Sequence, residues 1–272
     1  MTKFDTESLE FLFNKVLTKY NTDLSLYAMA SLERRLDRFL SLYHFDSIYH
    51  LTDKLIQDNQ YYDFFIKEIT VNTTEMFRDP TCWKIIRDEI LPSLKELPTI
   101  RIWHAGCSSG EEVFSMAILL KELGLFDKAK TIASDLNKEV IENAKQGIYS
   151  LKSVPINEEN YIKSGGLFSL NKYYTVKDNT IQMDSHLLEN VKFMRHDLST
   201  GIPFSKFDII LCRNVMIYFN KTLQENVFQL FQKSLFKNSF IIIGKKESMA
   251  YYTNAREFSE YNEAEKIYKL IS

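Results

Sequence analysis

The sequence has three cysteines, no long apolar run and almost no net charge. Cys82, Cys107 and Cys212 lie far apart and form no C-x-x-C pair, which argues against a disulfide framework or a zinc site and favours a reducing compartment. No apolar run approaches the roughly 18 residues of a membrane span, and the start, MTKFDTESLEFLFNK, lacks the apolar core of a signal peptide. A net charge of −2 gives no electrostatic reason to expect nucleic acid or a membrane surface as a partner. We therefore expect a cytoplasmic protein that does not insert into membranes.

Glycine and proline are absent from residues 5 to 70, so neither residue interrupts a helix there. Apolar side chains recur at helical spacing in this region, as in LEFLFNKV and LERRLDRFL. We predict a small bundle of three or four helices over residues 1–70. Residues 71–98 are predicted to form a linker and then a helix that begins at or next to Pro80, because proline suits the first turn of a helix.

From Thr99 onwards, short β-rich segments alternate with helical ones. RIWHA precedes EVFSMAILLKEL, and TIASD precedes KEVIENAKQG. This alternation predicts an α/β domain over residues 99–272, in which helices cover the faces of a mostly parallel, doubly wound sheet. The final segment, EKIYKLI, is expected to add an antiparallel strand.

The alternation stops between Ser150 and Asn190. There the segment GGLFSLNKYYTVKDNTIQM predicts antiparallel strands joined by a turn at Asp178-Asn179. We therefore predict an inserted β-subdomain at about residues 155–190. Gly165-Gly166 and the aromatic residues Phe168, Tyr173 and Tyr174 suit a hairpin that covers the edge of the sheet. They also suit a docking site at which a peptide adds a strand.

Residues 207–219, FDIILCRNVMIYF, form the most informative stretch of the chain. A short apolar run, typical of a strand buried on both faces, ends abruptly in Cys212-Arg213-Asn214. Open α/β sheets usually present polar side chains to a ligand at the carboxyl ends of their strands. Taken alone, the stretch would be explained better as a buried strand that emerges into solvent.

The loop Gly106–Glu112 follows the first strand and leads into a helix. Its glycines allow a ligand to approach the backbone, and the helix start offers free N–H groups. The lysine of a phosphate-binding loop is absent, and the two carboxylates suit a ligand with hydroxyl groups or positive charge better than a phosphate. A plain tight turn explains the loop equally well.

Acidic residues end the next two strands. Asp135 ends the second strand, where an acid commonly accepts hydrogen bonds from ribose hydroxyls, although it equally suits the N-cap of the helix near Lys138. Asp197 follows the third strand, VKFMRH. Polar groups that end several parallel strands converge on one crevice, which independent helix caps have no reason to do.

Together these segments resemble the CheR family of chemotaxis receptor methyltransferases over nearly the whole chain. The resemblance rests on N-x-T-x-x-F-R before the sheet, S-G-E-E, A-S-D and C-R-N-V-M-I-Y-F, of which the last is the most specific. It implies a Rossmann-like (class I) methyltransferase sheet with an all-α N-terminal domain and an inserted small antiparallel β-subdomain. It also implies transfer of a methyl group from S-adenosyl-L-methionine to glutamate side chains of membrane chemoreceptors, leaving S-adenosyl-L-homocysteine.

The resemblance further implies the site residues and requires no metal. Tyr218, Arg78 and Arg213 would be the catalytic residues, with Tyr218 near the transferring methyl group. The residues implied to bind the cofactor are Asn72, Thr74, Arg78, Glu111, Asp135, Asp197, Leu198, Arg213 and Asn214. Among these, Asp135 would hold the ribose, and Asp197 and Leu198 would lie beside the adenine.

The chain departs from the family pattern at positions that concern the substrate. Ser31 stands at a usual arginine position, and Gly244-Lys245-Lys246-Glu247 stands where many members read G-H-S-E, so we expect that wall of the cleft to be altered. Residues 1–70 carry 8 Lys and Arg against 11 Asp and Glu. The remaining arginines of SLERRLDRF, which are Arg34, Arg35 and Arg38, are the candidates for docking the cytoplasmic domain of a receptor.

Methyl transfer to a carboxylate requires positioning rather than a general base, because a carboxylate is already ionised at neutral pH. We therefore predict an active protein-glutamate O-methyltransferase that is monomeric. Two alternatives stay open: a methyltransferase that acts on another protein or small-molecule carboxylate, and a cofactor-binding signalling module that has lost catalysis.

Overall fold

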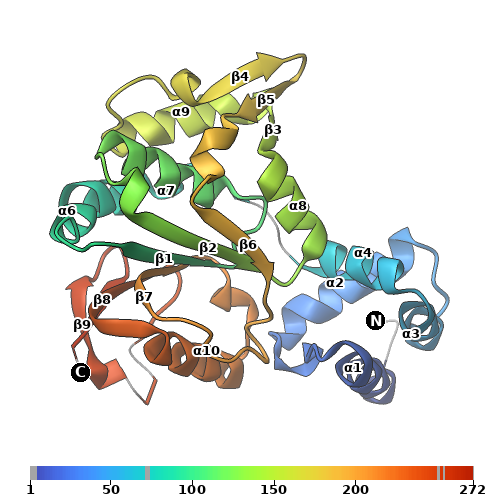
Figure 1. Cartoon of the computed structure of the whole chain (residues 1–272). Helices are drawn as coiled ribbons and strands as arrows, with labels where there is room; N and C mark the ends of the chain where they lie inside the picture. The colour runs from blue at the N-terminus through green and yellow to red at the C-terminus, as the bar shows by residue number, and fades with distance from the viewer. Residues whose placement is uncertain (1–4, 71–73, 250–251, 254, 272) are drawn as a thin grey trace.

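The computed structural model describes residues 5–70, 74–249, 252–253 and 255–271. These residues form an all-α domain, a seven-stranded sheet flanked by helices, and a small three-stranded sheet (Figure 1). Within these ranges, none of the helices combines the length and the apolar character that crossing a bilayer requires. Asn72, which the family resemblance implies as a cofactor ligand, lies outside the described residues.

The all-α domain contains the bundle predicted from the absence of glycine and proline. Its α-helices are α1 (Thr6–Tyr20), α2 (Met29–Leu42), α3 (Ile48–Gln57) and α4 (Asn59–Ile69). Asp5 and Ser47 cap α1 and α3, since their side chains accept hydrogen bonds from backbone N–H groups in the first turn. The apolar stripes of the helices meet in a single core, in which Leu12, Leu36 and Phe65 are fully buried.

The large sheet is doubly wound. Its strands, in spatial order, are β6 (Val191–Arg195), β2 (Ala129–Asp135), β1 (Ile100–Ala105), β7 (Phe207–Cys212), β8 (Leu235–Ile243), β10 (Ile267–Leu270) and β9 (Phe258–Asn262). The first five are parallel, and β10 pairs antiparallel with both β8 and β9. The predicted antiparallel final strand is therefore confirmed as β10, whereas β9 was not predicted. The strand order reverses between β1 and β7, and such a switch point is where open α/β sheets bind ligands.

Helices cover both faces of this sheet (Figure 1). They are α5 (Pro80–Ile85), α6 (Leu91–Ser93), α7 (Glu111–Glu122), α8 (Lys138–Gln146) and α10 (Lys221–Lys233), with a π-helical turn, η2 (Ile86–Ile90), between α5 and α6. Alternate side chains of each central strand enter two different cores, because strand side chains point to opposite faces. Ile102 and Ile209 pack in the core that contains α7, and Trp103 and Ile210 pack in the core that contains α10.

The connections between these elements contain short 3-10 helices. They are η1 (Leu24–Leu26), η3 (Phe126–Lys128), η4 (Leu151–Ser153), η5 (Leu170–Tyr173), η6 (Ser185–Leu188), η7 (Met216–Tyr218) and η8 (Ala255–Glu257). Of these, η1 and η7 bring the all-α domain and the large sheet together. Around them, Tyr27 and Phe219 form an isolated antiparallel bridge, and the Ala28 N–H donates to the Tyr218 carbonyl at 2.8 Å.

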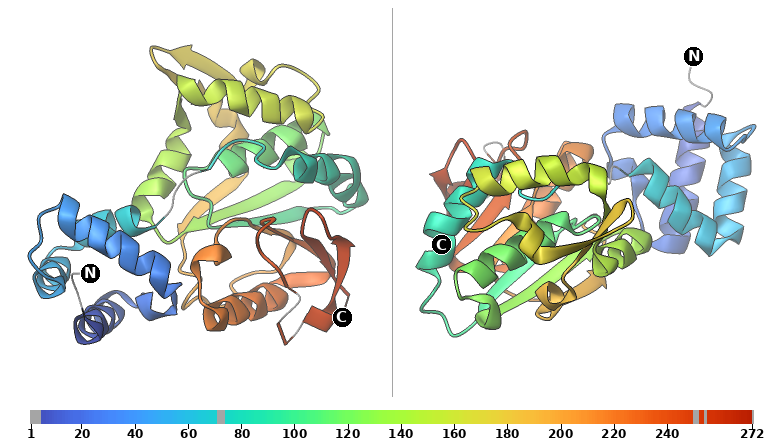
Figure 2. Two further views of the ribbon diagram at one scale, coloured as in Figure 1. Left: turned by 180° about the vertical axis from the view of Figure 1, so that it is seen from behind. Right: turned by 90° about the horizontal axis from the view of Figure 1, so that it is seen from above.

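The small sheet lies above the helix layer that contains α7 (Figures 1 and 2). Its strands, in spatial order, are β3 (Ile148–Ser150), β5 (Thr180–Met183) and β4 (Tyr174–Lys177), all antiparallel. The predicted turn at Asp178-Asn179 joins β4 to β5, with Asp178 at a φ of 54°. Two features were not predicted: β3 precedes residue 155, and a helix, α9 (Val154–Lys163), fills the first part of the insertion.

A buried polar cluster attaches the insertion to the main domain. The Glu122 carboxylate of α7 accepts hydrogen bonds from the hydroxyl groups of Tyr161 and Tyr173, the latter at 2.9 Å. It also forms an ion pair with Arg87, whose guanidinium nitrogen lies 2.6 Å away. Gly166 belongs to this junction rather than to a hairpin, since a Cβ there would lie 2.4 Å from the Tyr161 ring.

Candidate functional site

A cavity opens at the carboxyl ends of the parallel strands, beside the switch point between β1 and β7. Its lining combines residues from the all-α domain, the segment before α5, the glycine loop after β1, and the ends of β2, β6 and β7. The lining includes these residues of the sequence prediction: Arg35, Thr74, Arg78, Asp135, Asp197, Leu198, Arg213, Asn214 and Tyr218. Glu111 is not among the lining residues, whereas its neighbour Glu112 is.

The glycine loop makes a tight turn at the base of this cavity. The N–H groups of Gly106 and Cys107 both donate to the Ser134 carbonyl oxygen, at 2.8 and 2.9 Å. Gly106 has a φ of 81°, and a Cβ on it would lie 2.5 Å from a methyl carbon of Val215. A glycine is therefore required where this loop meets the segment after β7. Ser108 also adopts the left-handed region, with a φ of 49°.

Asp135 joins the end of β2 to this loop. Its Oδ2 accepts a hydrogen bond from the Ser108 N–H at 2.9 Å, and its Oδ1 accepts one from the Asn137 N–H at 3.0 Å. Burial raises the pKa of Asp135, and these backbone donors oppose that rise. The alternative that Asp135 caps the next helix is wrong, because Asn137 is the N-cap of α8.

Two lining side chains carry buried acceptors without a hydrogen-bond partner among the described residues. The Oδ1 atom of Asp197 accepts from the N–H and the hydroxyl of Ser199, but its Oδ2 is unpartnered. The Oδ1 of Asn214 is likewise unpartnered. Leaving a buried acceptor unsatisfied costs about 1–3 kcal/mol, so these atoms favour a ligand that supplies N–H or O–H donors. An amino-acid ammonium, ribose hydroxyls and an adenine amino group are such donors, so the residues present fit S-adenosylmethionine.

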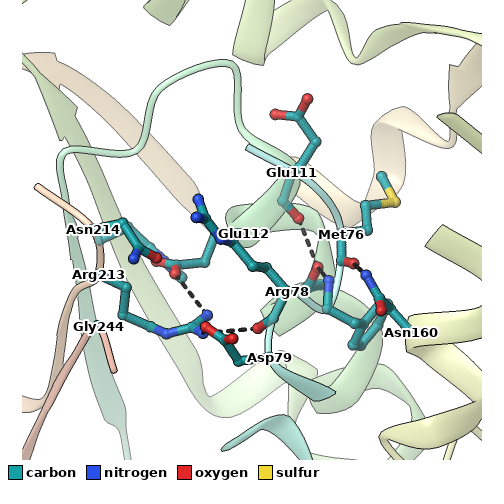
Figure 3. A network of polar contacts seen from close by, with 12 residues as sticks. Met76, Arg78, Asp79, Glu111, Glu112, Asn160, Arg213, Asn214 and Gly244 are labelled. Carbon is teal, nitrogen blue, oxygen red and sulfur yellow. Dashed lines mark hydrogen bonds and ion pairs between the residues drawn. The ribbon is translucent and has the colours of Figure 1, made fainter. Parts of the chain in front are cut away.

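Arg213 is the centre of a buried ionic network (Figure 3). Its side chain is 3% exposed, and NH2 donates to Asp79 Oδ2 at 2.8 Å and to the Arg78 carbonyl oxygen at 2.7 Å. NH1 lies 3.4 Å from Oε2 of Glu112, whose other oxygen is 2.8 Å from Nδ1 of the buried His104. Burial alone would raise the pKa of Glu112, but the bond to His104 and the charge of Arg213 bring it below its ordinary value. This network fixes the Arg213 guanidinium against the segment that carries Arg78.

The backbone around the cavity is strained. Phe77, Asp79 and Asn214 have φ values of 52°, 57° and 61°, as Ser108 does in the glycine loop. Each such non-glycine residue costs on the order of 1–3 kcal/mol and persists only where its surroundings hold it. Strain of this kind gathers at functional sites, which supports a functional role for this cavity.

Tyr218 lies where the all-α domain meets the cavity. The Arg35 guanidinium stacks on its ring, with 4.7 Å from the guanidinium carbon to the ring centroid. Arg35 also donates to the Ile69 carbonyl oxygen at 2.7 Å, so its orientation is fixed from both sides. Arg34 and Arg38 are exposed on α2, whereas Arg35 is half-buried. Of the three arginines predicted for receptor docking, Arg35 therefore lines the cavity and the other two are exposed to solvent.

Glu111 begins α7 but turns away from the cavity-lining set. It is 9% exposed, and its carboxylate accepts a hydrogen bond from the Ser109 hydroxyl at 2.7 Å. Burial raises the pKa of Glu111 to about 7, although the Ser109 hydroxyl acts in the opposite direction. Its assignment as a cofactor ligand stays a prediction.

Neither Lys245 nor Lys246 lines this cavity, although Lys246 lines a neighbouring one with Ile217, so the expected change to the cleft wall stays a prediction. The Lys245 ammonium pairs with Glu265 at 3.0 Å. Glu247 is buried and accepts hydrogen bonds from the N–H groups of Asn214 and Ile217, both at 3.2 Å. This segment thus supports the backbone after β7 through Glu247.

Some site residues were missed by sequence reasoning: Tyr27, Asp79, His104, Glu112 and His196. Glu112 stood inside the recognised S-G-E-E motif, but its two adjacent acids could not be ranked without the phase of the helix. Asp79 directly follows the N-x-T-x-x-F-R motif and was not singled out. Tyr27 and His104 carried no local signal. Within the described ranges, no group of three or more His, Cys, Asp or Glu side chains is placed to hold a metal ion.

Comparison with known proteins agrees with this geometry. Residues 72–266 match the family model of the CheR methyltransferase SAM-binding domain, and residues 7–70 match that of the CheR all-alpha domain. A putative methyltransferase, Cher3, of Pseudomonas putida is 37% identical over 261 residues, covering 96% of each chain. Proteins named chemotaxis protein methyltransferase are 32% identical in Borreliella burgdorferi, covering 89% of this chain and 88% of that one, and 29% identical in Listeria innocua, covering 90% and 92%.

We predict that Glu111→Gln stabilises the protein at about pH 8 but not at about pH 5. A carboxyl group whose pKa is about 7 when folded, against an ordinary 4.5, binds more protons in the folded state between these pH values. Stability contributed by the protonated group is therefore lost as the pH rises through that window. Thermal unfolding of both proteins across the window measures the effect. A difference in Tm that does not change with pH would contradict it.

Proposed function

Since the chain belongs to the CheR methyltransferase family, we propose that it is a protein-glutamate O-methyltransferase that methylates chemoreceptors. The observation that carries this proposal is the convergence in one cavity of residues from separate segments that the family resemblance implies. Arg78 and Tyr218 lie there together with Asp135 and Asp197. The product would be a glutamate methyl ester, in the role of adaptation during chemotaxis.

We assign the cofactor, S-adenosylmethionine, to this cavity. Asp135 would accept hydrogen bonds from the ribose hydroxyls, and Asp197 and Leu198 would lie beside the adenine. Thr74 and Asn214 line the same cavity and would complete the polar contacts, and Asn72 is proposed with them on the resemblance alone. When bound, the cofactor supplies an electrophilic methyl group on a sulfonium.

The chemistry asked of the protein is placement and exclusion of water. A glutamate carboxylate needs no deprotonation at neutral pH, so no general base is required. Arg78 would orient the carboxylate or the cofactor through its N–H donors, which cannot take or give a proton near neutral pH. Tyr218 would close the cavity against water, with its ring held under Arg35.

Arg213 is better supported as a positioning residue than as a group that touches the substrate. Its guanidinium is buried and its donors are directed at Asp79, Glu112 and the Arg78 carbonyl. Through its bond to the Arg78 carbonyl oxygen, the Arg213 guanidinium holds the Arg78 segment against the end of β7.

The proposed partner is the cytoplasmic domain of a membrane chemoreceptor. Relatives of similar length carry the name chemotaxis protein methyltransferase, which supports this choice. With that substrate the protein would act in the cytoplasm, and we expect it to act as a monomer.

Incubation with radiolabelled S-adenosylmethionine and membranes from the source organism should transfer label to receptor-sized proteins. The label should be released by mild base, since a methyl ester is hydrolysed where N-methyl groups are not. Label on a small-molecule fraction would favour another carboxylate as the substrate. Binding of the cofactor without any transfer would favour a signalling module.

Asp135→Ala should weaken binding of S-adenosylhomocysteine. Hydrogen bonds to a charged acceptor contribute about 1.5–3 kcal/mol, which corresponds to roughly tenfold or more in Kd. Calorimetry with the natural ligand and with an analogue lacking the ribose hydroxyls separates this effect from disturbance of the Ser108 loop. If Asp135 binds the ribose, the analogue loses little on mutation. Equal losses for both ligands would reject the assignment.

Arg34→Glu combined with Arg38→Glu should raise the apparent KM for receptor while the affinity for S-adenosylhomocysteine stays unchanged. Both side chains are exposed on α2, where they would meet an acidic receptor helix. The attraction should weaken with salt, because it is screened over roughly 10 Å at 0.1 M. A charge-neutral change at the exposed Tyr49 serves as the control for general surface effects. Receptor kinetics that do not change in the double variant would leave these arginines as ordinary surface residues.

A further inference from the structure

The backbone of Met76 is held by two side chains of the inserted segment. The Met76 N–H donates to Oδ1 of Asn157 at 3.1 Å, and Nδ2 of Asn160 donates to the Met76 carbonyl oxygen at 3.2 Å (Figure 3). Both asparagines lie on α9, three residues apart and hence on one face. They are buried, with exposures of 1% and 7%. Since a backbone N–H only donates and a carbonyl only accepts, Met76 dictates which way each amide points.

Met76 is two residues from Arg78, and the residues between are fixed as well. The Phe77 N–H donates to the Ser115 hydroxyl of α7 at 2.9 Å, and Phe77 has the strained φ of 52°. The Arg78 carbonyl oxygen accepts from Arg213 at 2.7 Å. The conformation that turns Arg78 into the cavity is therefore held from α9, α7 and the end of β7 in succession.

Of these supports, the one from α9 belongs to the insertion, which otherwise packs outside the main sheet (Figure 2). Asparagine is an unfavourable choice for a buried face of a helix, because its amide must find partners there. Two of them placed to match the donor and acceptor of one residue form a specific clamp on that residue.

We propose that Asn157 and Asn160 are positioning residues through which the inserted segment sets the placement of Arg78. The proposal rests on the proposed function, in which Arg78 contacts the cofactor or the substrate. It makes the insertion a working part of the methyl-transfer site. A role confined to satisfying buried polar groups is the competing explanation, and it predicts loss of stability without a specific effect at Arg78.

The two positions offer a matched pair of variants. Asn157→Asp keeps an acceptor for the Met76 N–H, whereas Asn160→Asp sets a carboxylate against the Met76 carbonyl oxygen. Both place a carboxylate on the same buried face, so the cost of burying it is shared. Hydrogen exchange of the amides in residues 74–79 should become about tenfold faster in Asn160→Asp and change little in Asn157→Asp. Asn160→Leu, which removes the donor without adding a charge, replaces the aspartate variant if that variant does not fold.

A mutant cycle with Arg78 tests whether the effect acts through that side chain. Asn160→Asp should weaken binding of S-adenosylhomocysteine about fivefold in the wild-type background and not at all in Arg78→Met. Asn160→Gln keeps an amide donor for the Met76 carbonyl oxygen. Where hydrogen exchange of residues 74–79 is as slow in this variant as in the wild type, its affinity for S-adenosylhomocysteine should also be that of the wild type.

Two results would overturn the positioning role. One is a loss of binding free energy in the double variant that equals the sum of the losses in the two single variants. The other is unchanged hydrogen exchange of residues 74–79 in Asn160→Asp and Asn160→Leu. If wild-type protein binds no S-adenosylhomocysteine, the proposed function fails, and the exchange measurement alone decides whether α9 holds the Arg78 segment. Faster exchange confined to residues 74–79 supports the clamp in that case. Faster exchange spread over the whole chain shows general destabilisation and counts against it.

Discussion

The site depends on the need to neutralise one buried cation. Arg213 directly follows β7 at the switch point of the sheet, where its side chain is almost completely enclosed. A buried guanidinium is stable only when carboxylates and carbonyl groups surround it with good geometry. Here those partners come from α7 through Glu112 and from the segment before α5 through Asp79 and the Arg78 carbonyl. The partners of this one cation thus bring together the segment before α5, helix α7 and the end of β7.

The same requirement explains why the backbone is strained at this place. Asp79 reaches Arg213 from a left-handed conformation, and Phe77, two residues earlier, is left-handed as well. Conformations of this kind are retained where the surroundings hold each residue in several directions. Ser115 holds Phe77, and the asparagines of α9 hold Met76. The stability contributed by the large hydrophobic cores therefore offsets the conformational cost of the strained loop beside the cavity.

Much of the fold was predictable because burial repeats along the chain at the spacing of helices and strands. The polar groups at the ends of β2 and β7 were predictable for a related reason, since Asp135 ends one apolar strand and Arg213 directly follows another, which places both at the sheet edge. Helix α9 was missed because VPINEENYIK has no apolar stripe, and its buried residues are Asn157, Asn160 and Tyr161. The choice between Glu111 and Glu112 depended on the phase of α7, which adjacent identical residues do not reveal. The partners of Arg213 lie more than 100 residues away in sequence, so no local pattern could indicate them.

The all-α domain contributes Tyr27 and Arg35 to the cavity wall, and its backbone is bonded to the carbonyl of Tyr218. The two regions that separate family models describe therefore form the wall of this cavity together. In a hybrid that joins the all-α domain of one relative to the SAM-binding domain of another, the seam between the two sequences would run through the cavity wall. A substitution on one side of that seam would change what the other side touches, because Arg35 of α2 stacks on the ring of Tyr218.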